Sequence, residues 1–304
     1  MTSVKGKPPI LHISGVFAFC SKVRLGAMSE NSQLSAAAAY SIEFARQKLE
    51  GRKIIALTGA GISTDSGIPD YRGAGRTPRH PMTYDSFMGS PEARIRYWSR
   101  SFVGWNRIGE AKPNAGHFAL AAAETSGALS SIITQNVDQL HQKAGSQKVI
   151  DLHGRLDQVK CMSCGLQMSR VQMDELLTLA NPNVTKDVEI EFTPDGDAEI
   201  EATEGFIVPP CPKCGGILKP DVVFFGESVP TLRVEEAMRR LDEAEALLVA
   251  GTSLAVNSGL RFARRAAKAN VPIVIVNIGP TRADELAIAK IEANTSAVLE
   301  RLLQ

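Results

Sequence analysis

The fold is decided by the stretch Lys53-Ile54-Ile55-Ala56-Leu57-Thr58-Gly59-Ala60-Gly61-Ile62-Ser63. Its apolar part, residues 54–57, is typical of a strand that is buried on both faces of a parallel sheet. The glycines that follow permit a tight turn and let backbone N–H groups approach a pyrophosphate closely. A strand that runs into such a turn predicts a ligand site at the carboxyl edge of a sheet.

Similar apolar runs recur along the chain, and helical patterns alternate with them. The runs are residues 131–134, 246–250 and 272–277, and the helical patterns are residues 35–49, 115–125, 233–244, 257–269 and 283–290. Strand–helix alternation indicates a parallel sheet covered by helices on both faces. Residues 70–110 break the rhythm, and their arginines, prolines, glycines and aromatics predict a mobile loop with small helices.

The composition excludes several classes of protein. The 304 residues hold 34 basic and 33 acidic side chains, a net charge of +1, so no bulk field attracts nucleic acid or an anionic membrane. The apolar share of 44% suits a globular chain and is too high for extensive disorder. The sequence contains no apolar run of about 18 residues, the length that crosses a bilayer.

Four of the five cysteines form two matching pairs, Cys161/Cys164 and Cys211/Cys214. In each pair two residues separate the thiols and a glycine follows, so both sulfurs can face one tetrahedral ion. Four thiolate ligands leave no open position, which predicts one structural Zn²⁺ ion and not a catalytic one. A redox dithiol is the weaker interpretation, because two equivalent pairs rarely serve one dithiol function. The fold class is therefore predicted as α/β, a doubly wound parallel (Rossmann-like) sheet with a second, smaller zinc-binding domain.

The glycine turn departs from the fingerprint of dehydrogenases. Thr64 stands where a third glycine is expected, and residues 75–81, about 20 residues on, contain no strand that ends in an acid. A dinucleotide is compatible with these residues, but hydride transfer is not supported. A glycine turn without a ligand stays open as the alternative.

Polar residues follow the predicted strands directly. Gln135, Asn136 and Asp138 come after the run 131–134, and His153 with Gly154 comes after a short run at 148–150. Ligands in open α/β sheets bind outside the carboxyl ends of strands, so these side chains are candidates for one site. His153 is a candidate base near neutral pH, although a single histidine is often structural. We expect His117 and His141, both within helical patterns, to be structural.

Two further strand ends carry small residues and hydrogen-bonding groups, at 251–253 and 277–279. Strand ends of this kind at several places predict one extended ligand across the sheet. Taken together, the segments 59–63, 66–72, 134–138, 153–154, both cysteine pairs, 251–253 and 277–279 resemble the sirtuins, the NAD-dependent protein-lysine deacylases. The resemblance runs from about Ile54 to Leu303, and residues 96–106, 218–227 and 277–282 are most similar to the class II subgroup of mitochondrial and bacterial proteins.

The resemblance implies NAD and one Zn²⁺ as cofactors. It implies three catalytic residues: His153 as the general base toward the ribose hydroxyls, and Asn136 and Asp138, which hold nicotinamide together with Ile68. The implied cofactor-binding residues are Gly59, Ala60, Gly61, Ile68, Asp70, Tyr71, Arg72, Gln135, Asn136, Val137, Asp138, Gly251, Thr252, Ser253, Asn277, Ile278, Gly279 and Thr295.

The implied reaction releases nicotinamide, free lysine and O-acyl-ADP-ribose from acylated-lysine proteins or peptides. The substrate would thread between two domains as an extended strand beside residues 222–226. Tyr71 stands where many sirtuins have phenylalanine, and the Tyr-x-x-Arg signature of the succinyl- and malonyl-removing subgroup is not convincingly placed. The acyl preference therefore stays open.

The chain is predicted to divide into three parts. Residues 1–30 have no acid before Glu30 and are expected to be a disordered leader or a targeting segment. Residues 31–157 and 221–304 form the NAD-binding Rossmann-like domain. Residues 158–220 form an inserted zinc module, with eight acids and no base at 187–204, and part of 72–110 joins this small domain.

Two other functions stay open. A protein mono-ADP-ribosyltransferase would use the same NAD site with a different acceptor. A non-enzymatic zinc-ribbon protein that binds nucleic acid is opposed by the acidic insertion and the lack of a basic stripe. We expect neither nucleic acid nor a membrane as a partner, and the sequence does not indicate the oligomeric state. The expected location is cytoplasmic for a bacterial protein and the mitochondrial matrix for a eukaryotic one.

Overall fold

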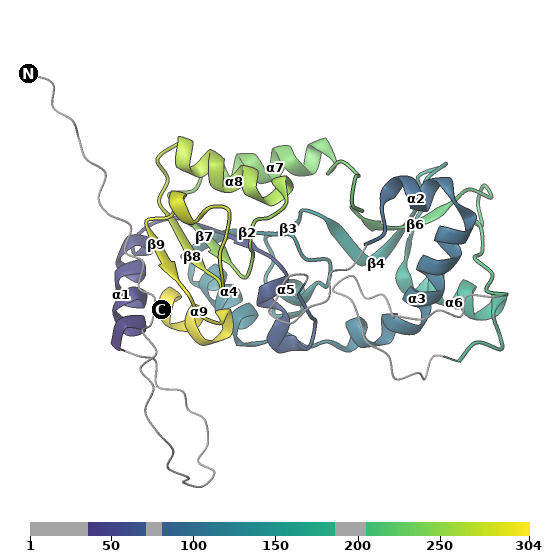
Figure 1. The fold of residues 1–304 in the computed structure, drawn as a ribbon, viewed down its shortest axis with the longest axis horizontal. Coiled ribbons are helices and arrows are strands. Elements are labelled where there is room, and N and C mark those ends of the chain that lie inside the picture. The colour runs from purple at the N-terminus through teal and green to yellow at the C-terminus, as the bar shows by residue number, and fades with distance from the viewer. Residues whose placement is uncertain (1–35, 71–80, 186–204) are drawn as a thin grey trace, which may run out of the picture.

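A six-stranded parallel sheet forms the centre of the larger half of the molecule (Figure 1). The computed structural model describes residues 36–70, 81–185 and 205–304. The strand order is β3-β2-β1-β7-β8-β9, which is the order of doubly wound dinucleotide-binding folds and confirms the predicted α/β class. The strands are β1 (Ile54–Thr58), β2 (Leu129–Thr134), β3 (Val149–Asp151), β7 (Ala246–Ala250), β8 (Ile273–Val276) and β9 (Ala289–Ile291).

Helices cover both faces of this sheet, which explains its apolar strands. Every residue of β1, β7 and β8 is buried. Because successive side chains of a strand point to opposite faces, Ile54 and Ala56 join one core and Ile55 and Leu57 join the other. The first face is covered by α1 (Ala36–Leu49), α4 (Ala115–Ser126) and α9 (Thr295–Leu303), and the second by α7 (Thr231–Asp242) and α8 (Asn257–Lys268).

The loops after β1 and β7 touch through their backbones. The two strands are neighbours at the point where the strand order reverses, and the amide of Gly61 donates to the carbonyl of Gly251 over 2.8 Å. A Cβ atom on Gly59 would lie 2.6 Å from the Cβ of Thr252, and one on Gly61 would lie 2.9 Å from the Gly251 oxygen. The glycine turn is therefore required by this close approach, at the crevice where ligands of doubly wound sheets bind.

A smaller antiparallel sheet forms the other half of the molecule (Figure 1). Its strands are β4 (Gly154–Cys161), β5 (Gln167–Ser169) and β6 (Leu218–Val222), in the order β5-β4-β6. The helices α2 (Tyr84–Gly89), α3 (Pro91–Glu110) and α6 (Arg170–Ala180) surround a third core. The buried indole of Trp98 in this core donates to the carbonyl of Leu218 over 3.1 Å, which joins α3 to β6.

The structure differs from the predicted elements at two places. Residues 91–110 form one long helix, α3, where a loop with small helices was expected. Residues 283–290 are not a helix: a single 3₁₀ turn, Asp284–Leu286, leads into the short edge strand β9, which pairs with β8. The prediction was wrong there because strand pairing outweighs a weak helical pattern over so few residues.

Three groups of sequence-based expectations lie outside the described residues: those for residues 1–30, for Tyr71 and Arg72, and for the acidic segment 187–204. Within the described ranges, each helix is too short or too polar to cross a membrane.

The contact between the two loops is testable with a pair of glycines. Gly251 and Gly127 both have positive φ, but a Cβ on Gly251 would clash with the backbone of Ile62, whereas one on Gly127 would meet open space. We expect Gly127→Ala to lower the free energy of unfolding by about 1 kcal/mol, and Gly251→Ala by about 3 kcal/mol or more. Urea unfolding of both variants measures this, and equal losses would contradict the close approach.

Candidate active site

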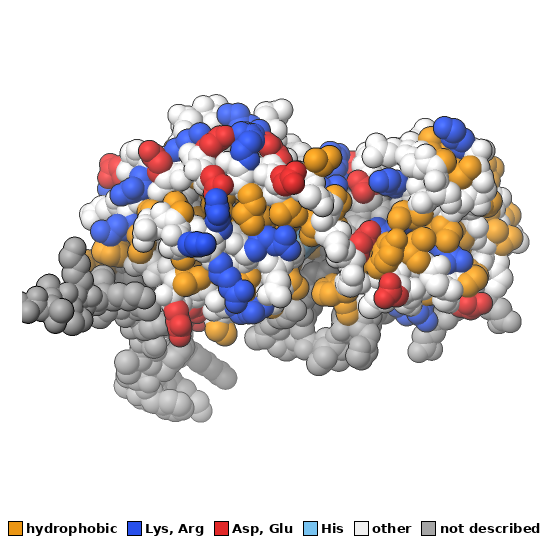
Figure 2. Space-filling view, turned by 90° about the horizontal axis from the view of Figure 1, so that it is seen from above, with side chains coloured by type: hydrophobic (Ala, Val, Ile, Leu, Met, Phe, Trp, Pro, Cys, Tyr) orange, Lys and Arg blue, Asp and Glu red, His pale blue; other side chains and the backbone are white. Residues whose placement is uncertain are grey.

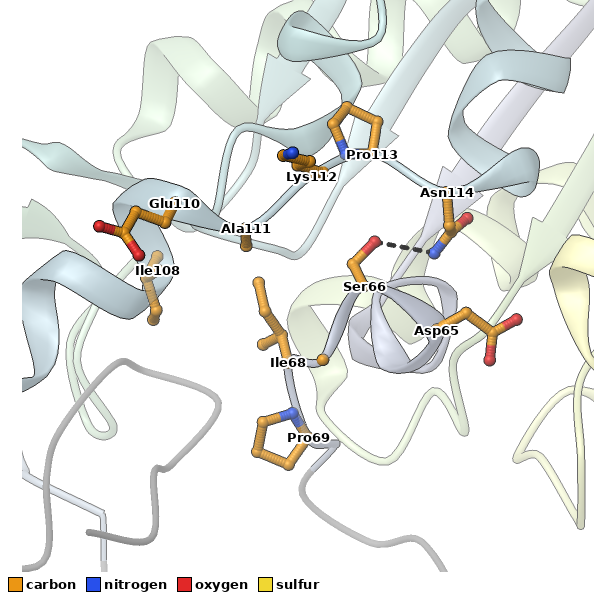
Figure 3. Close-up of a pocket in the computed structure, with 11 residues that line it drawn as sticks. Asp65, Ser66, Ile68, Pro69, Ile108, Glu110, Ala111, Lys112, Pro113 and Asn114 are labelled. Atoms are coloured by element: carbon orange, nitrogen blue, oxygen red, sulfur yellow. Dashed lines mark hydrogen bonds between the residues drawn. The ribbon is translucent and has the colours of Figure 1, made fainter. Parts of the chain in front are cut away.

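A pocket of about 530 Å³ opens beside the loop that follows β1 (Figure 3). The 3₁₀ turns Ala60–Ile62 and Thr64–Ser66 lead to Ile68, whose side chain points toward Ala111 across the pocket. Asn114 holds this loop in place, since its side-chain amide donates to the Ile62 carbonyl over 2.8 Å and to Ser66 Oγ over 3.0 Å. The lining residues run from Asp65 to Pro69 and from Glu110 to Asn114, with Ile108 beside them.

The predicted pair Asn136 and Asp138 meets the β1 loop at Ser63. Ser63 Oγ donates to Asp138 Oδ2 over 2.7 Å and accepts from Asn136 Nδ2 over 3.1 Å. All three residues are buried. Burial raises the pKa of Asp138, although hydrogen bonds from the Leu140 amide and from Ser63 act in the opposite direction. The result is a compact polar cluster, built from two neighbouring strand ends, that can orient an amide.

Beneath this cluster lies a buried chain of polar groups. The backbone amide of Asn136 donates to Thr134 Oγ1 over 3.1 Å, and Thr58 Oγ1 donates to the same oxygen over 2.9 Å. Thr58 Oγ1 also lies 2.9 Å from His141 Nε2. Because the Thr58 hydroxyl proton is used toward Thr134, His141 Nε2 carries the proton toward Thr58. The backbone of Asn136 and the ring of His141 are thus connected by one chain of hydrogen bonds through Thr134 and Thr58.

The ring of His141 packs against that of His117, with centroids 4.9 Å apart. Both rings are fully buried in the helices α4 and α5 (Leu140–Lys143), as expected of structural histidines. Burial lowers the pKa of His117 to about 4, and burial together with the neighbouring His117 lowers the pKa of His141 well below its usual value. Both imidazoles are therefore neutral at pH 7.

His153 lies directly after β3, at the carboxyl edge of the large sheet. Its Nδ1 is 2.9 Å from the carbonyl oxygen of Gln135, and its Nε2 is 2.8 Å from Ser258 Oγ. Burial lowers the pKa of His153, the bond to the Gln135 carbonyl opposes this, and the positive charges of Arg233 and Arg261 lower the pKa further. A neutral histidine with its ring held at both nitrogens is suited to accept a proton.

Gln135 connects His153 to the β7 loop. Its side-chain amide donates to Thr252 Oγ1 over 3.0 Å and to the Thr58 carbonyl over 3.1 Å. The structure thus brings the ends of β1, β2 and β7 together around Gln135, as the sequence predicts.

The remaining predicted contacts are more dispersed. Asn277 follows β8, and its side chain donates to the carbonyls of Ile278 and Gly279 in its own loop. Ile278 is 70% exposed, so its side chain lies at the surface. Thr295 begins α9, which packs against the turn that contains Ala60. Its hydroxyl is buried and, among the described residues, has no hydrogen-bond partner.

The four paired cysteines converge in the smaller half of the molecule. Their sulfur atoms all lie within 4.8 Å of one another, and two knuckle turns, at Cys161–Gly165 and Cys211–Gly215, are closed by backbone hydrogen bonds. The amides of Cys164 and Ser163 donate to Cys161 Sγ and lower the pKa of this thiol to about 6. Four convergent sulfurs of this kind fit a tetrahedral Zn²⁺ ion.

The Sir2 family model matches residues 59–258, about two thirds of the chain. The chain belongs to the Sir2 family. Relatives of this Sir2 chain include the NAD-dependent protein deacetylase of Xanthomonas axonopodis pv. citri (strain 306), 54% identical over 253 residues that cover 82% of this chain and 86% of the relative. The NAD-dependent protein deacetylase 1 of Mycobacterium avium (strain 104) is 50% identical over 258 residues, which cover 84% and 92%.

Solved Sir2 structures share the fold. One, from work on the mechanism and regulation of Sir2 enzymes, has a TM-score of 0.69 and 30% identity and covers 87% of this chain and 96% of its own. Another, a Sir2–p53 peptide–NAD⁺ complex, has a TM-score of 0.68 and 31% identity and covers 85% and 95%. The resemblance to sirtuins that the sequence motifs indicate is thereby confirmed.

Sequence reasoning assigned no role to three residues that the structure places at this Sir2 site. Ser63 joins Asn136 to Asp138, Asn114 braces the pocket loop, and Ser258 contacts His153. Ser63 ends the glycine turn and could have been suspected from its place there. Ser258 lies far from His153 in the sequence, so no local pattern indicates their contact.

The histidine pair gives a measurable expectation. We expect the NMR titration of His117 to have its midpoint near pH 4, and that of His141 to lie well below the ordinary value of about 6.5. The unfolded chain binds these protons at higher pH than the folded one, so stability is lost as the pH falls from about 6.5 toward 4. The urea-unfolded protein is the control, and a native midpoint near 6.5 for either ring would contradict its burial.

The cysteine cluster predicts one bound zinc ion per chain. Removing it with a chelator should loosen the third core, in which Cys161 and Cys211 pack with Trp98. Both tryptophans of the chain, Trp98 and Trp105, belong to α3, so their fluorescence reports on this half of the molecule. Cys164→Ala should lower the zinc content and Cys20→Ser should not. A chain that purifies without zinc and keeps its fluorescence in chelator would overturn the assignment.

Proposed function

We propose that this Sir2-family chain is an NAD-dependent protein-lysine deacylase that releases nicotinamide, free lysine and O-acyl-ADP-ribose. One observation carries the proposal: His153 is partly buried at the sheet edge that also carries the Asn136–Asp138 cluster, with Nδ1 at the Gln135 carbonyl and Nε2 at the Ser258 hydroxyl, a place that a ribose hydroxyl would take. The names of the relatives support NAD-dependent protein deacetylation, and the peptide–NAD⁺ complex supports a site for a peptide and NAD.

The residues of the β1–β7 crevice fit a dinucleotide. Gly59 and Gly61 let the loop after β1 pack directly against Thr252 and Gly251, and Ala60 lies between the two glycines at the start of a 3₁₀ turn. The amino end of this turn, at the Ala60 amide, would face a pyrophosphate. The loops at Gly251, Ser253 and Asn277, and the buried hydroxyl of Thr295, would face the adenosine end.

The nicotinamide end would lie against Ile68 and the Ser63–Asn136–Asp138 cluster. When bound, NAD supplies a ribose C1′ from which nicotinamide can leave. Asn136 and Asp138 would orient the carboxamide through hydrogen bonds, and Ile68 would exclude water from the pocket wall. His153 would then remove a proton from a ribose hydroxyl at its Nε2 atom.

The acylated lysine would arrive along the segment that follows β6. The amide of Val223 donates to the carbonyl of His153 over 2.7 Å, so this segment runs beside the base. Lys219, almost fully buried, holds the segment in shape: its Nζ donates to the Val222 carbonyl and pairs with Glu227 Oε2 over 3.0 Å. A main chain held in this way suits the addition of an extended peptide, which is read mainly by its backbone.

The charges on one face of the molecule argue against the binding of a nucleic acid there. Figure 2 shows basic and acidic side chains intermixed on the face that α7 and α8 cover. On this face Arg239 and Arg240 pair with Glu236, and Arg265 pairs with Asp242. Paired cations of this kind do not form the basic stripe that phosphates require.

The proposal is tested by mass spectrometry of reactions with NAD and a panel of acyl-lysine peptides. We expect free lysine, nicotinamide and O-acyl-ADP-ribose in equal amounts, and we expect His153→Ala to abolish all three while the unfolding midpoint stays close to that of the parent protein. ADP-ribose attached to protein, without O-acyl-ADP-ribose, would instead indicate the mono-ADP-ribosyltransferase. Undiminished deacylation by His153→Ala would exclude the assigned base.

A further inference from the structure

Ser258 contacts the imidazole of His153 from a distant part of the chain. Its hydroxyl oxygen lies 2.8 Å from His153 Nε2, on the ring atom opposite to the one that faces Gln135. Ser258 is the second residue of α8, and its side chain is half-buried. Its position places a hydroxyl group directly at the nitrogen that would accept the substrate's proton.

The hydrogen-bond roles follow from the partner at the other nitrogen. A carbonyl oxygen only accepts, so the contact between Nδ1 and the Gln135 oxygen requires the proton to be on Nδ1. In the neutral ring Nε2 then has a free lone pair and no hydrogen. Ser258 must therefore donate its hydroxyl proton to Nε2. The two contacts together select one of the two neutral tautomers, and it is the tautomer that a base acting at Nε2 needs.

We propose that Ser258 is a positioning residue for His153, and that its hydroxyl holds the imidazole in the orientation and tautomer in which Nε2 is the base. Only the expected effect of Ser258 on turnover rests on the proposed function of His153. The contact itself, and its effect on the tautomer, belong to the protein without any ligand.

The first turn of α8 is suited to this task because it is rigidly placed. Leu260, Phe262 and Ala263 of the same helix are buried in the core against the large sheet. Gly259, next to Ser258, packs against Gln135: a Cβ atom there would lie 2.5 Å from Gln135 Oε1. The first turn of α8 therefore contacts both His153 and Gln135. The Ser258 hydroxyl contacts His153, and Gly259, which has no side chain, lets Gln135 approach the helix closely.

Loss of the hydroxyl should leave the ring less restrained. In Ser258→Ala only the bond from Nδ1 to the Gln135 carbonyl restrains the ring, so the ring can leave that carbonyl for part of the time and then exchange tautomers. One neutral hydrogen bond is lost, and we expect kcat to fall roughly threefold to tenfold. Because Ser258 acts through His153, the KM for NAD should change much less than kcat.

The deciding experiment is ¹⁵N NMR of the histidine side chains in the unliganded protein, which reads the tautomer directly. The chain has five histidines, and His153→Gln identifies the signals of His153. We expect the parent protein to show the Nδ1–H tautomer alone, Ser258→Ala to show a measurable share of the Nε2–H tautomer, and Ser258→Thr, which keeps a hydroxyl, to resemble the parent. Ser126→Ala is the matched control. Ser126 is an exposed serine at the end of α4, and it lies near the amino end of β2, away from the carboxyl end that leads to Gln135.

The outcomes distinguish a failure of the positioning role of Ser258 from a failure of the proposed deacylase function. An unchanged tautomer in Ser258→Ala overturns the positioning role, whatever happens to turnover. A changed tautomer with unchanged kcat also overturns it, since the restraint would then have no effect on the base. A parent protein that shows the expected tautomer but releases no nicotinamide from NAD contradicts the proposed function and leaves the contact between Ser258 and His153 intact.

Discussion

The close approach of two backbone turns governs the arrangement of the whole site. The amide of Gly61 reaches the carbonyl of Gly251 at the point where the strand order of the sheet reverses, and no side chain fits between them. The turn after β1 therefore delivers Ser63 to the end of β2, where it meets Asn136 and Asp138. The turn after β7 leads into α8 and so sets the position of Ser258. Side chains from distant segments converge because these two turns touch.

The buried polar groups of the site stabilise one another in place of water. Asp138 would be costly to bury alone, and its two oxygens accept from Ser63 and from the Leu140 amide. The chain from Asn136 through Thr134 and Thr58 to His141 is made of uncharged groups, which avoids the cost of an unpaired charge in the interior. Strong bonds among fixed dipoles leave the polar floor little freedom to rearrange, so it is ordered before a ligand arrives.

The sequence predicts the central strands of the parallel sheet well because each of them has a simple local signature. β1, β7 and β8 are buried on both faces and read as short apolar runs. The cysteine pairs are equally easy to recognise in the sequence, because the spacing within each pair reflects the geometry of a single turn. α3 was not predicted as one helix, because its aromatic residues pack in a core of the smaller half that includes residues far away in the sequence. Contacts such as Ser258 with His153 depend on the packing of α8, which no local pattern encodes.

One backbone contact joins the segment after β6 to His153. The carbonyl of His153 accepts from Val223, and the next residue, Gly154, has positive φ and passes so close to Asp221 that a Cβ atom would clash with its carbonyl oxygen. β4 begins directly after His153, and β6 leads to Val223. These two strands are thus held together where the two halves of the molecule meet. A shift of the backbone at residues 222–226 consequently also moves the imidazole of His153. Under the proposed function, substrate selectivity can therefore change more readily in the side chains beside residues 222–226 than in that main chain.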